Sequence, residues 1–494
     1  MHLTRRSFLV SSAGAAAASA FADRGFALSS SVSSQTLAHD ILRPQYHLLP
    51  VHNWMNDPNG PIYWRGQYHV FFQYNPNGAI WGDMHWAHAM SPDMVHWKHL
   101  PIALAPTPGG PDQSGCFSGS AVIQHRVAAV LYTGVEPAPP GQATLRDVNL
   151  RESQCLATSQ DQELRSWQKL AKPVIAAPPP GLEVTGFRDP CLWRDGDVWC
   201  LGLGSGLFKQ GGAVLLYRSS DLRAWEYLHP LCSGAWNGKT TTDPVDSGEM
   251  WECPDFFPLG DKHVLLYSTE RKVYWEVGDY DRKELKFHSQ KRGLLDSGAY
   301  YAPKSMLDRD GNRILWGWVP ETRAVEQYKA AGWAGLMALP RVLTVGSSGD
   351  LEMRVIPAVQ TLRRAPQINV DNLSFANFSA ELSASIQPAA KPFAVRIGPE
   401  QKLYLDLCYE PAQQVLLINE QSVPLAAPIA KESPLNIFMD GSVIEVFVAN
   451  RHAHTLRIYS LDRSSPNTPV RVSGALAGVH LWPVKPISND RLTT

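Results

Sequence analysis

Residues 57–74 read DPNGPIYWRGQYHVFFQY, and this stretch decides the expected fold. It has a polar start, a short apolar run, a turn and then a run of strongly β-forming residues. Four later stretches repeat this plan from Phe117, Phe187, Glu252 and Tyr301, so that successive starts lie 60, 70, 65 and 49 residues apart. Repeats of this size that hold several short strands are typical of the blades of a β-propeller.

The five repeats therefore predict an all-β fold with a five-bladed β-propeller over residues 46–345. If each repeat opens with the innermost strand of its blade, the five starts converge at one mouth of the central channel. This arrangement would bring Asp57, Asp189 and Glu252 together although they lie far apart in the sequence. The alternative is a series of similar hairpins within a β-sandwich.

A second domain is predicted at the C-terminal end. Residues 346–365 are expected to form a linker with a helical turn. Beyond it, residues 366–494 alternate in polarity, and LNIFMDGSVIEVFVAN (435–450) carries a strong two-residue hairpin turn at Asp440–Gly441. This pattern predicts a C-terminal β-sandwich of about 130 residues, a usual size for such domains, in which we find no chemistry.

The N-terminus resembles a secretion signal. Residues 1–22 join Arg5 and Arg6 to a short, mildly apolar run with small residues near Ala20 and Ala22. This pattern predicts a twin-arginine signal peptide, followed by an N-terminal linker over 23–45, and an exported protein in the periplasm or outside the cell. A transmembrane helix is the alternative, but the run is short and rich in Ala and Ser.

Composition restricts the partner and the redox chemistry. The chain has 494 residues, enough for two domains, and its formal net charge is −1. This balance predicts a neutral partner, with no nucleic acid and, after signal removal, no membrane. The seven cysteines form no C-x-x-C pair, and twin-arginine export carries folded protein, so we expect mostly buried thiols.

The three acidic residues suggest glycoside hydrolysis. A retaining glycosidase uses one ionised carboxylate as nucleophile and one protonated carboxyl as acid. Asp57 suits the nucleophile, because neighbouring asparagines and turn amides could hydrogen-bond its charge. Glu252 suits the acid, because Trp251 and its other sequence neighbours offer an apolar setting. Asp189 follows Arg188, a fixed cation that can hold sugar hydroxyls or a carboxylate.

At these residues the sequence resembles glycoside hydrolase family 32, the invertases and β-fructosidases. The motifs occur in order between about Tyr46 and Leu362, and they include WMNDPNG, FSGSAV, FRDP, MWECPDFFP, YYAPKSM and GWAGLMALPR. The resemblance implies a five-bladed propeller plus a sandwich, and release of fructose from terminal β-fructofuranosides with retention. It further implies Asp57 as nucleophile, Glu252 as acid/base and Asp189 as transition-state stabiliser.

The resemblance also implies a fructose pocket. Its residues would be Trp54, Asn56, Gln73, Trp81, Phe117, Ser118 and Arg188. Packing between strands is the alternative for the two tryptophans. Phe117 stands where many relatives carry Trp, and Ala87 replaces a usual Gly, so the chain-length preference does not follow from the family.

Other functions and ligands stay open at this point. A non-catalytic sugar-binding propeller and a propeller glycosidase for arabinans or galactans are the alternatives. Two H-x-x-H pairs, His85 with His88 and His96 with His99, resemble metal ligands, but strand residues three apart face opposite sides, so we expect no metal and no cofactor. The sequence leaves undecided the preference for sucrose or fructan, exo or endo action, hydrolysis or transfer, and the oligomeric state.

Overall fold

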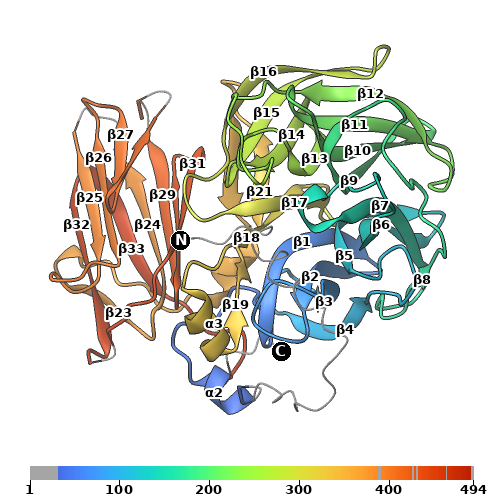
Figure 1. Cartoon of the computed structure of the whole chain (residues 1–494). Helices are drawn as coiled ribbons and strands as arrows, with labels where there is room; N and C mark the ends of the chain where they lie inside the picture. The colour runs from blue at the N-terminus through green and yellow to red at the C-terminus, as the bar shows by residue number, and fades with distance from the viewer. Residues whose placement is uncertain (1–31, 388–390, 426–427, 430–431, 463, 491–494) are drawn as a thin grey trace.

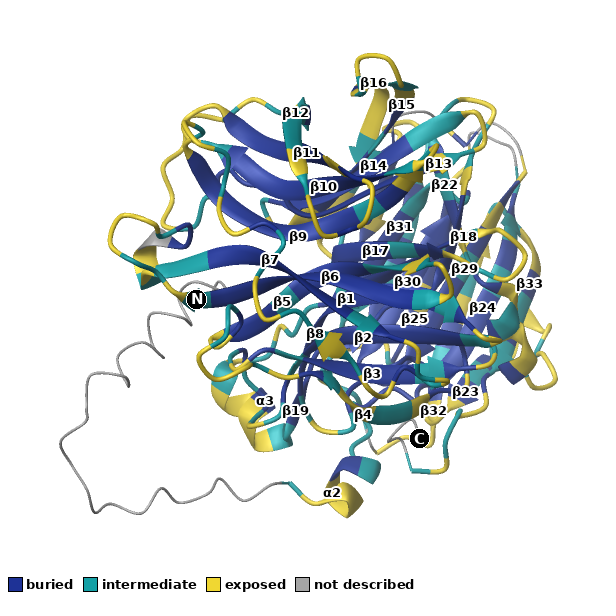
Figure 2. Cartoon of the chain, turned by 90° about the vertical axis from the view of Figure 1, so that its right-hand side faces the viewer, coloured by how far each residue is buried: buried dark blue, intermediate teal, exposed yellow. Residues whose placement is uncertain are grey.

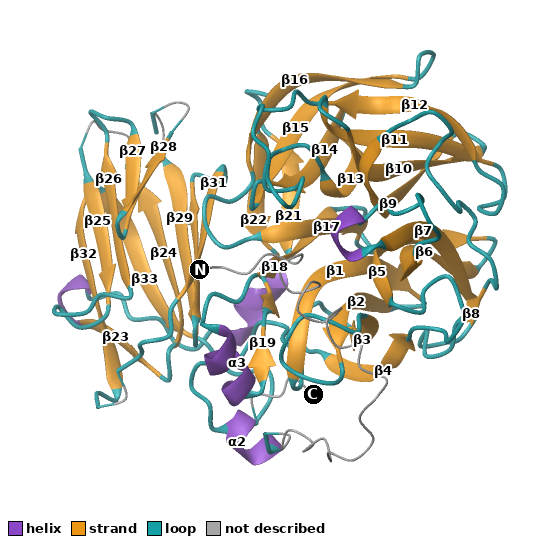
Figure 3. Cartoon of the chain, in the orientation of Figure 1, coloured by secondary structure: helices purple, strands orange, loops and turns teal. Residues whose placement is uncertain are grey.

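The computed structural model describes residues 32–490 apart from 388–390, 426–427, 430–431 and 463. The predicted signal peptide (1–22) and residues 23–31 of the predicted N-terminal linker lie outside the described residues. Strands make up most of the described chain, whereas its α-helices are the short α2 (Ser34–Ala38) and α3 (Val325–Ala331) (Figure 3). Within this described part, no helix has the length and apolarity needed to cross a bilayer.

The N-terminal domain consists of five sheets that follow one another along the chain and are antiparallel except where β19 pairs with β1. The first holds β1 (Asn53–Trp64), β2 (Gln67–Asn75), β3 (His85–Ser91), β4 (Lys98–Leu104) and the later β19 (Trp333–Ala334). The second holds β5 (Gly115–Gln124), β6 (Val127–Pro137), β7 (Leu150–Ser159) and β8 (Gln168–Lys169), with a 3-10 helix at Arg146–Val148. The third holds β9 (Val184–Asp195), β10 (Val198–Leu207), β11 (Gly211–Ser219) and β12 (Glu226–Ser233).

The last two sheets complete this domain. The fourth holds β13 (Glu252–Leu259), β14 (Lys262–Thr269), β15 (Lys272–Asp281) and β16 (Lys286–Leu294). The fifth holds β17 (Tyr301–Leu307), β18 (Arg313–Val319), β20 (Leu336–Met337), β21 (Arg341–Val345) and β22 (Leu351–Val355). Each sheet therefore begins with the strand that opens one of the five sequence repeats.

The first strands of the five sheets form the centre of the domain. β1 contacts β5 and β17, β9 contacts β5 and β13, and β13 contacts β17, which closes a ring. These strands are buried along most of their length, as the dark central ribbons of Figure 2 show. These contacts agree with the prediction that the repeats open with innermost strands, and the sheets lie around the ring (Figure 1).

The C-terminal domain is a β-sandwich. One sheet orders β23 (Leu373–Ala376), β32 (Asn467–Gly474), β25 (Phe393–Ile397), β26 (Leu405–Glu410), β27 (Val415–Ile418) and β28 (Gln421–Pro424). The other orders β31 (His452–Arg457), β30 (Val443–Val448), β29 (Ser433–Asp440), β24 (Ser379–Ile386) and β33 (Leu476–Pro483). Apolar side chains from both sheets form one core, and the predicted turn at Asp440–Gly441 joins β29 to β30. The all-β prediction with a propeller followed by a sandwich is confirmed.

The segment predicted as a linker, 346–365, is more structured than its composition indicates. It contains β22, which pairs with β21 as the outer strand of the fifth sheet, and then the 3-10 helix Pro357–Leu362. A further 3-10 helix, Val370–Asn372, precedes the sandwich strands. Alternating Leu351 and Met353 are buried in the core of the domain, a short pattern that sequence analysis missed.

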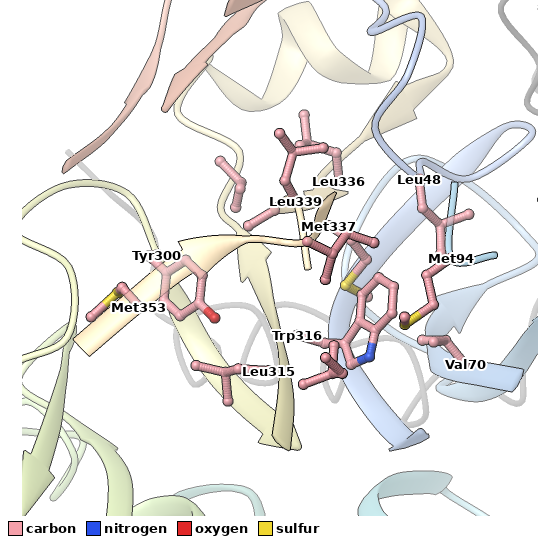
Figure 4. Close-up of a cluster of buried hydrophobic side chains, with 14 of the residues drawn as sticks. Leu48, Val70, Met94, Tyr300, Leu315, Trp316, Leu336, Met337, Leu339 and Met353 are labelled. Atoms are coloured by element: carbon pink, nitrogen blue, oxygen red, sulfur yellow. The ribbon is translucent and has the colours of Figure 1, made fainter. Parts of the chain in front are cut away.

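A large apolar cluster joins the N-terminal segment to the first and fifth sheets. Figure 4 shows Leu48, Val70, Trp316 and Met337 packed together, with Tyr300 and Met353 nearby. The segment before β1 is therefore fixed rather than loose. Gly335 allows the turn between β19 and β20 to press on β1, since its φ is +78° and a Cβ there would lie 2.0 Å from the Met55 carbonyl oxygen.

The cysteines behave as predicted. All seven are free thiols, and five of them are buried. Burial raises the pKa of most of these thiols, for example of Cys191 to about 12, so they are unreactive packing groups at neutral pH.

Candidate active site

The five central strands share one local irregularity near their starts. Their pairing shifts register between Met55 and Pro58, Cys116 and Gly119, Arg188 and Cys191, Glu252 and Asp255, and Tyr301 and Lys304. In the last three strands the residue before a proline has a positive φ, at 64° for Asp189, 48° for Cys253 and 51° for Ala302. Such bulges redirect side chains, and they place polar groups on strands that are otherwise buried.

Asp57 is fully buried and is held by hydrogen-bond donors. The Ser118 hydroxyl donates to its Oδ2 at 2.6 Å, and the Asn56 amide donates to its Oδ1 at 3.0 Å. Trp54 Nε1 in turn donates to Asn56 Oδ1 at 2.7 Å, which orients that amide. Donors on both carboxylate oxygens fix the orientation of this side chain.

Asp189 lies beside Asp57, with one thiol between them. Cys253 Sγ lies 3.5 Å from Asp57 Oδ2 and 3.4 Å from Asp189 Oδ2, and the Cys253 amide donates to Asp189 Oδ2 at 2.9 Å. The Asp189 amide itself donates to the Thr133 hydroxyl at 2.9 Å. Since Glu252 directly precedes Cys253, the structure gathers acidic residues from three separate sheets. Burial and the nearby charges of Asp189 and Asp57 raise the pKa of the Cys253 thiol, so the thiol stays neutral and can donate.

Glu252 is bound by a cation and a phenol. Arg188 donates to its Oε1 from Nε at 3.1 Å and from Nη2 at 2.9 Å, and the Tyr301 hydroxyl donates to its Oε2 at 2.8 Å. The opposite side of Arg188 donates from Nη1 to Glu152 Oε1 at 2.9 Å. Burial alone would lower the pKa of Arg188, but Glu152 and Glu252 outweigh it, so the guanidinium stays charged.

The surroundings of Glu252 differ from the expected apolar setting. Trp251 turns away and stacks on Tyr267, with the ring centroids 3.9 Å apart, and Cys253 faces the aspartates. Neighbouring residues of a strand point in different directions, so sequence neighbours do not form the environment of a strand residue. The polar contacts of Glu252 come instead from β9 and β17.

The predicted pocket residues fall into three groups. Asn56, Ser118 and Arg188 contact the acids directly. Trp54, Trp81 and Phe117 belong to an aromatic cluster near the start of β1, where the Trp81 and Phe117 ring centroids lie 5.8 Å apart. Gln73 donates to the Cys116 carbonyl at 3.0 Å and so fixes the start of β5 rather than contacting an acid.

Three polar neighbours of the acids were missed by sequence analysis: Glu152, Tyr301 and Cys253. Tyr301 opens the fifth repeat and Cys253 lies inside MWECPDFFP, so the repeat phase could have identified both. Glu152 lies in the unremarkable stretch NLRESQ on β7, and no local signal marks it.

The histidine pairs do not converge as metal ligands. His88 is buried and contacts His69 at 2.9 Å, whereas His85 contacts the Asp83 carbonyl in the preceding loop. His96 contacts Asp93 at 2.8 Å. Burial lowers the pKa of His69 to about 4 and holds that of His88 well below its usual value, so this pair is neutral, and the His88 ring packs against Phe71.

Comparison with family models covers almost the whole described chain. The model described as "Glycosyl hydrolases family 32 N-terminal domain" matches residues 47–354, and "Glycosyl hydrolases family 32 C terminal" matches residues 355–482. Among curated proteins, the sucrose-6-phosphate hydrolase of Escherichia coli is 36% identical over 453 residues, covering 84% of this chain and 89% of the relative. The raffinose invertase of Escherichia coli is 35% identical over 456 residues with the same coverages.

Solved structures agree with these matches. A Bombyx mori GH32 β-fructofuranosidase superposes with a TM-score of 0.77 at 29% identity, covering 92% of this chain and 96% of that one. Fructan 1-exohydrolase IIa from Cichorium intybus superposes with a TM-score of 0.75 at 27% identity, covering 90% and 98%.

Proposed function

This chain belongs to glycosyl hydrolase family 32, and we propose that it releases fructose by a double displacement with Asp57 as nucleophile, Glu252 as acid/base and Asp189 as transition-state stabiliser. The resemblance inferred from the motifs is thereby confirmed. The protein is a glycoside hydrolase of the β-fructosidase class, acting on sucrose and fructans. The observation that carries the assignment of residues is the meeting of three acids from three sheets around Cys253.

The first step forms a covalent intermediate. A carboxylate oxygen of Asp57 attacks the anomeric carbon of the fructosyl unit, and the bond from this carbon to the leaving oxygen breaks. Glu252 gives its proton to that oxygen, so that the leaving sugar departs as an alcohol. Ser118 and Asn56 hold the attacking carboxylate in place, and Arg188 and Tyr301 hold the acid.

The second step releases fructose. Glu252, now ionised, takes a proton from water, and the water oxygen attacks the anomeric carbon and displaces Asp57. Two inversions at one carbon give net retention. Asp189, held by the Cys253 amide, is placed to accept hydrogen bonds from fructosyl hydroxyls as charge develops on the ring. Trp54, Gln73, Trp81 and Phe117 complete the pocket in this proposal.

The finer architecture is part of the same proposal. We infer that the five sheets are the five blades of the propeller, with the catalytic domain running from 46 to the end of β22 and the sandwich over 366–494. The closed contact ring of β1, β5, β9, β13 and β17 supports five blades. The pairing of β22 with β21 favours a later end of the catalytic domain.

We also propose export through the twin-arginine route, because Arg5 and Arg6 precede a short apolar run. Immunoblotting of periplasmic, cytoplasmic and secreted fractions tests it, and replacing both arginines by lysine should retain the precursor in the cytoplasm. Enzyme found only in the cytoplasm of the wild-type strain would contradict export.

Product analysis tests the function. The wild-type protein should release fructose from sucrose, inulin or levan, and proton NMR should show the β anomer first; sucrose 6-phosphate serves as a further substrate. Asp57→Asn and Glu252→Gln should each lower kcat by at least about 100-fold, the lower end for acid–base catalysis. Exposed Asp261 provides the control, since Asp261→Asn should retain activity. Full sucrose and fructan hydrolysis by either site variant would refute the assigned roles.

A further inference from the structure

The strand that borders β1 on one side belongs to a segment that lies about 280 residues later in the sequence. The rim segment, residues 320–335, leaves the fifth sheet after β18, forms α3 and returns as β19. β19 pairs in parallel with β1, with Trp333 opposite Asn53 and Ala334 opposite Trp54. Trp54 lies three residues before Asp57, so at about 3.3 Å per residue β19 borders β1 roughly 10 Å from the proposed nucleophile.

The rim segment contacts the predicted pocket directly. The Tyr328 ring lies 5.9 Å from the Trp54 ring, and Tyr328 and Val325 pack in one cluster with Trp81. The Asn53 amide donates to the Gly332 carbonyl at 2.7 Å. The segment thus supports two aromatic residues of the proposed fructose pocket, Trp54 and Trp81.

A buried ion pair closes the rim segment on itself. Glu321, at its start, accepts hydrogen bonds from Arg323 Nε at 3.0 Å and from Arg323 Nη2 at 2.7 Å. Arg323 Nη2 also donates to the Trp333 carbonyl at 2.9 Å, and its guanidinium lies 4.6 Å from the Trp333 ring centroid. The position of Glu321 therefore determines the position of β19.

The sandwich domain holds this ion pair. The Tyr459 hydroxyl donates a hydrogen bond to Glu321 Oε1 at 2.6 Å and accepts one from the Thr322 amide at 3.2 Å. In addition, Arg457 Nη2 lies 3.8 Å from Glu321 Oε2. The guanidinium groups of Arg323 and Arg457 lie 5.2 Å and 5.0 Å from the Tyr459 ring centroid. Burial alone would raise the pKa of Glu321, but Arg457 and Arg323 lower it to about 2, so the cluster stays charged over the working pH range.

We propose that Tyr459 is a positioning residue that connects the sandwich domain to substrate choice. Through Glu321 it holds the rim segment against Trp54 of the proposed fructose pocket, and so, in this proposal, sets the affinity for substrates whose further sugars extend from that pocket. The chemistry at the anomeric carbon stays with residues of β1, β9 and β13. This inference rests on the proposed function and assigns to the sandwich a role in binding the leaving-group side of sucrose and fructans.

Steady-state kinetics of Tyr459→Phe test this role. The variant keeps the ring between the two guanidinium groups and loses the hydroxyl that contacts Glu321. We expect KM to rise about 3-fold to 10-fold for inulin, equivalent to about 0.7–1.4 kcal/mol and within the usual range for one hydrogen bond, with kcat within 2-fold of wild type. The ratio of kcat/KM for inulin to that for sucrose should change as well, because inulin extends further over the rim.

Two further variants exclude a general loss of folding. Tyr409→Phe removes the hydroxyl of another buried sandwich tyrosine, which accepts from the Ile429 amide, and should leave every constant unchanged. Glu321→Gln should raise KM at least as much as Tyr459→Phe does. All constants are measured well below each variant's melting temperature.

The outcomes separate the two proposals. A wild-type enzyme that releases no fructose from any substrate would refute the proposed function. An active wild type, with KM and substrate ratio unchanged in both Tyr459→Phe and Glu321→Gln, would refute the positioning role alone. A fall in kcat at constant KM would also refute it, because the rim would then act on the chemical step.

Discussion

Replacing Glu152 by glutamine should move the alkaline limb of the pH–rate profile. Glu152 is fully buried on β7 and lies across Arg188 from the proposed acid Glu252. Its negative charge opposes ionisation of Glu252, whereas Arg188 favours it. The substitution removes that charge and keeps the shape of the side chain, so it favours the ionised form of Glu252. An ionised Glu252 has no proton to give to the leaving oxygen. Activity should be lost at lower pH than in the wild type.

The size of this effect follows from the geometry. Arg188 Nη1 lies 2.9 Å from Glu152 Oε1, and Arg188 Nη2 lies 2.9 Å from Glu252 Oε1. The two carboxylates are thus about 7 Å apart across the guanidinium, and an effective dielectric constant of about 20 gives about 2 kcal/mol between two unit charges. At about 1.4 kcal/mol per pH unit, the limb should move by about one to two pH units.

The assay is kcat/KM for sucrose between about pH 4 and pH 9, which reports the essential groups of the free enzyme. Glu136→Gln is the matched control, because Glu136 of β6 pairs with Arg151 of β7 and has no contact with Arg188 among the described residues. Its profile should coincide with the wild-type profile. An alkaline limb that stays in place or moves upward in Glu152→Gln would refute the electrostatic argument.

Two further predictions concern the nucleophile and the interface between the domains. Ser118→Ala removes the 2.6 Å hydrogen bond to Asp57 and should lower kcat about 10-fold to 100-fold, as expected for a charge-assisted bond; an unchanged kcat in stopped assays would contradict this orientation of Asp57. At the interface, burial alone would lower the pKa of His47, but its hydrogen bonds to Asp440 and Glu445 raise it to about 9. Because the folded-state pKa exceeds the unfolded value, the resulting stability is complete below about pH 6.5 and disappears as pH rises through about 9. Urea titrations should show the free energy of unfolding falling by on the order of 3 kcal/mol over this window in the wild type and much less in His47→Gln; equal pH dependence would refute the charged histidine.

The strands and the positions of the acids within the sequence repeats could be predicted from the sequence, because both depend on local patterns. The run from Asp57 to Tyr74 contains an apolar stretch, a turn and a β-forming stretch, and the same order of residue types recurs in each repeat. The turn at Asp440–Gly441 was predicted from two residues. β22 was missed because its two buried residues make a pattern too short to distinguish from a loop.

The surroundings of the acids could not be predicted in the same way. Trp251 is adjacent to Glu252 in the sequence, yet it stacks on Tyr267 of the next strand and leaves Glu252 to Arg188 and Tyr301. A bulge and a positive φ at the following residue decide these directions, and both depend on how the central strands pack.

By itself, the sequence determined the repeated strands, the two domains and the family, and it indicated three candidate acids, since turn residues, periodicity and ordered motifs are properties of short stretches. Only the tertiary structure decided which charged groups lie near those acids, which groups fix their orientation, and which residues surround them. Glu152 reaches Arg188 from another strand, and Tyr459 reaches Glu321 across the domain boundary. Such contacts depend on the closure of the ring and on the docking of the sandwich, and no stretch of chain encodes them alone.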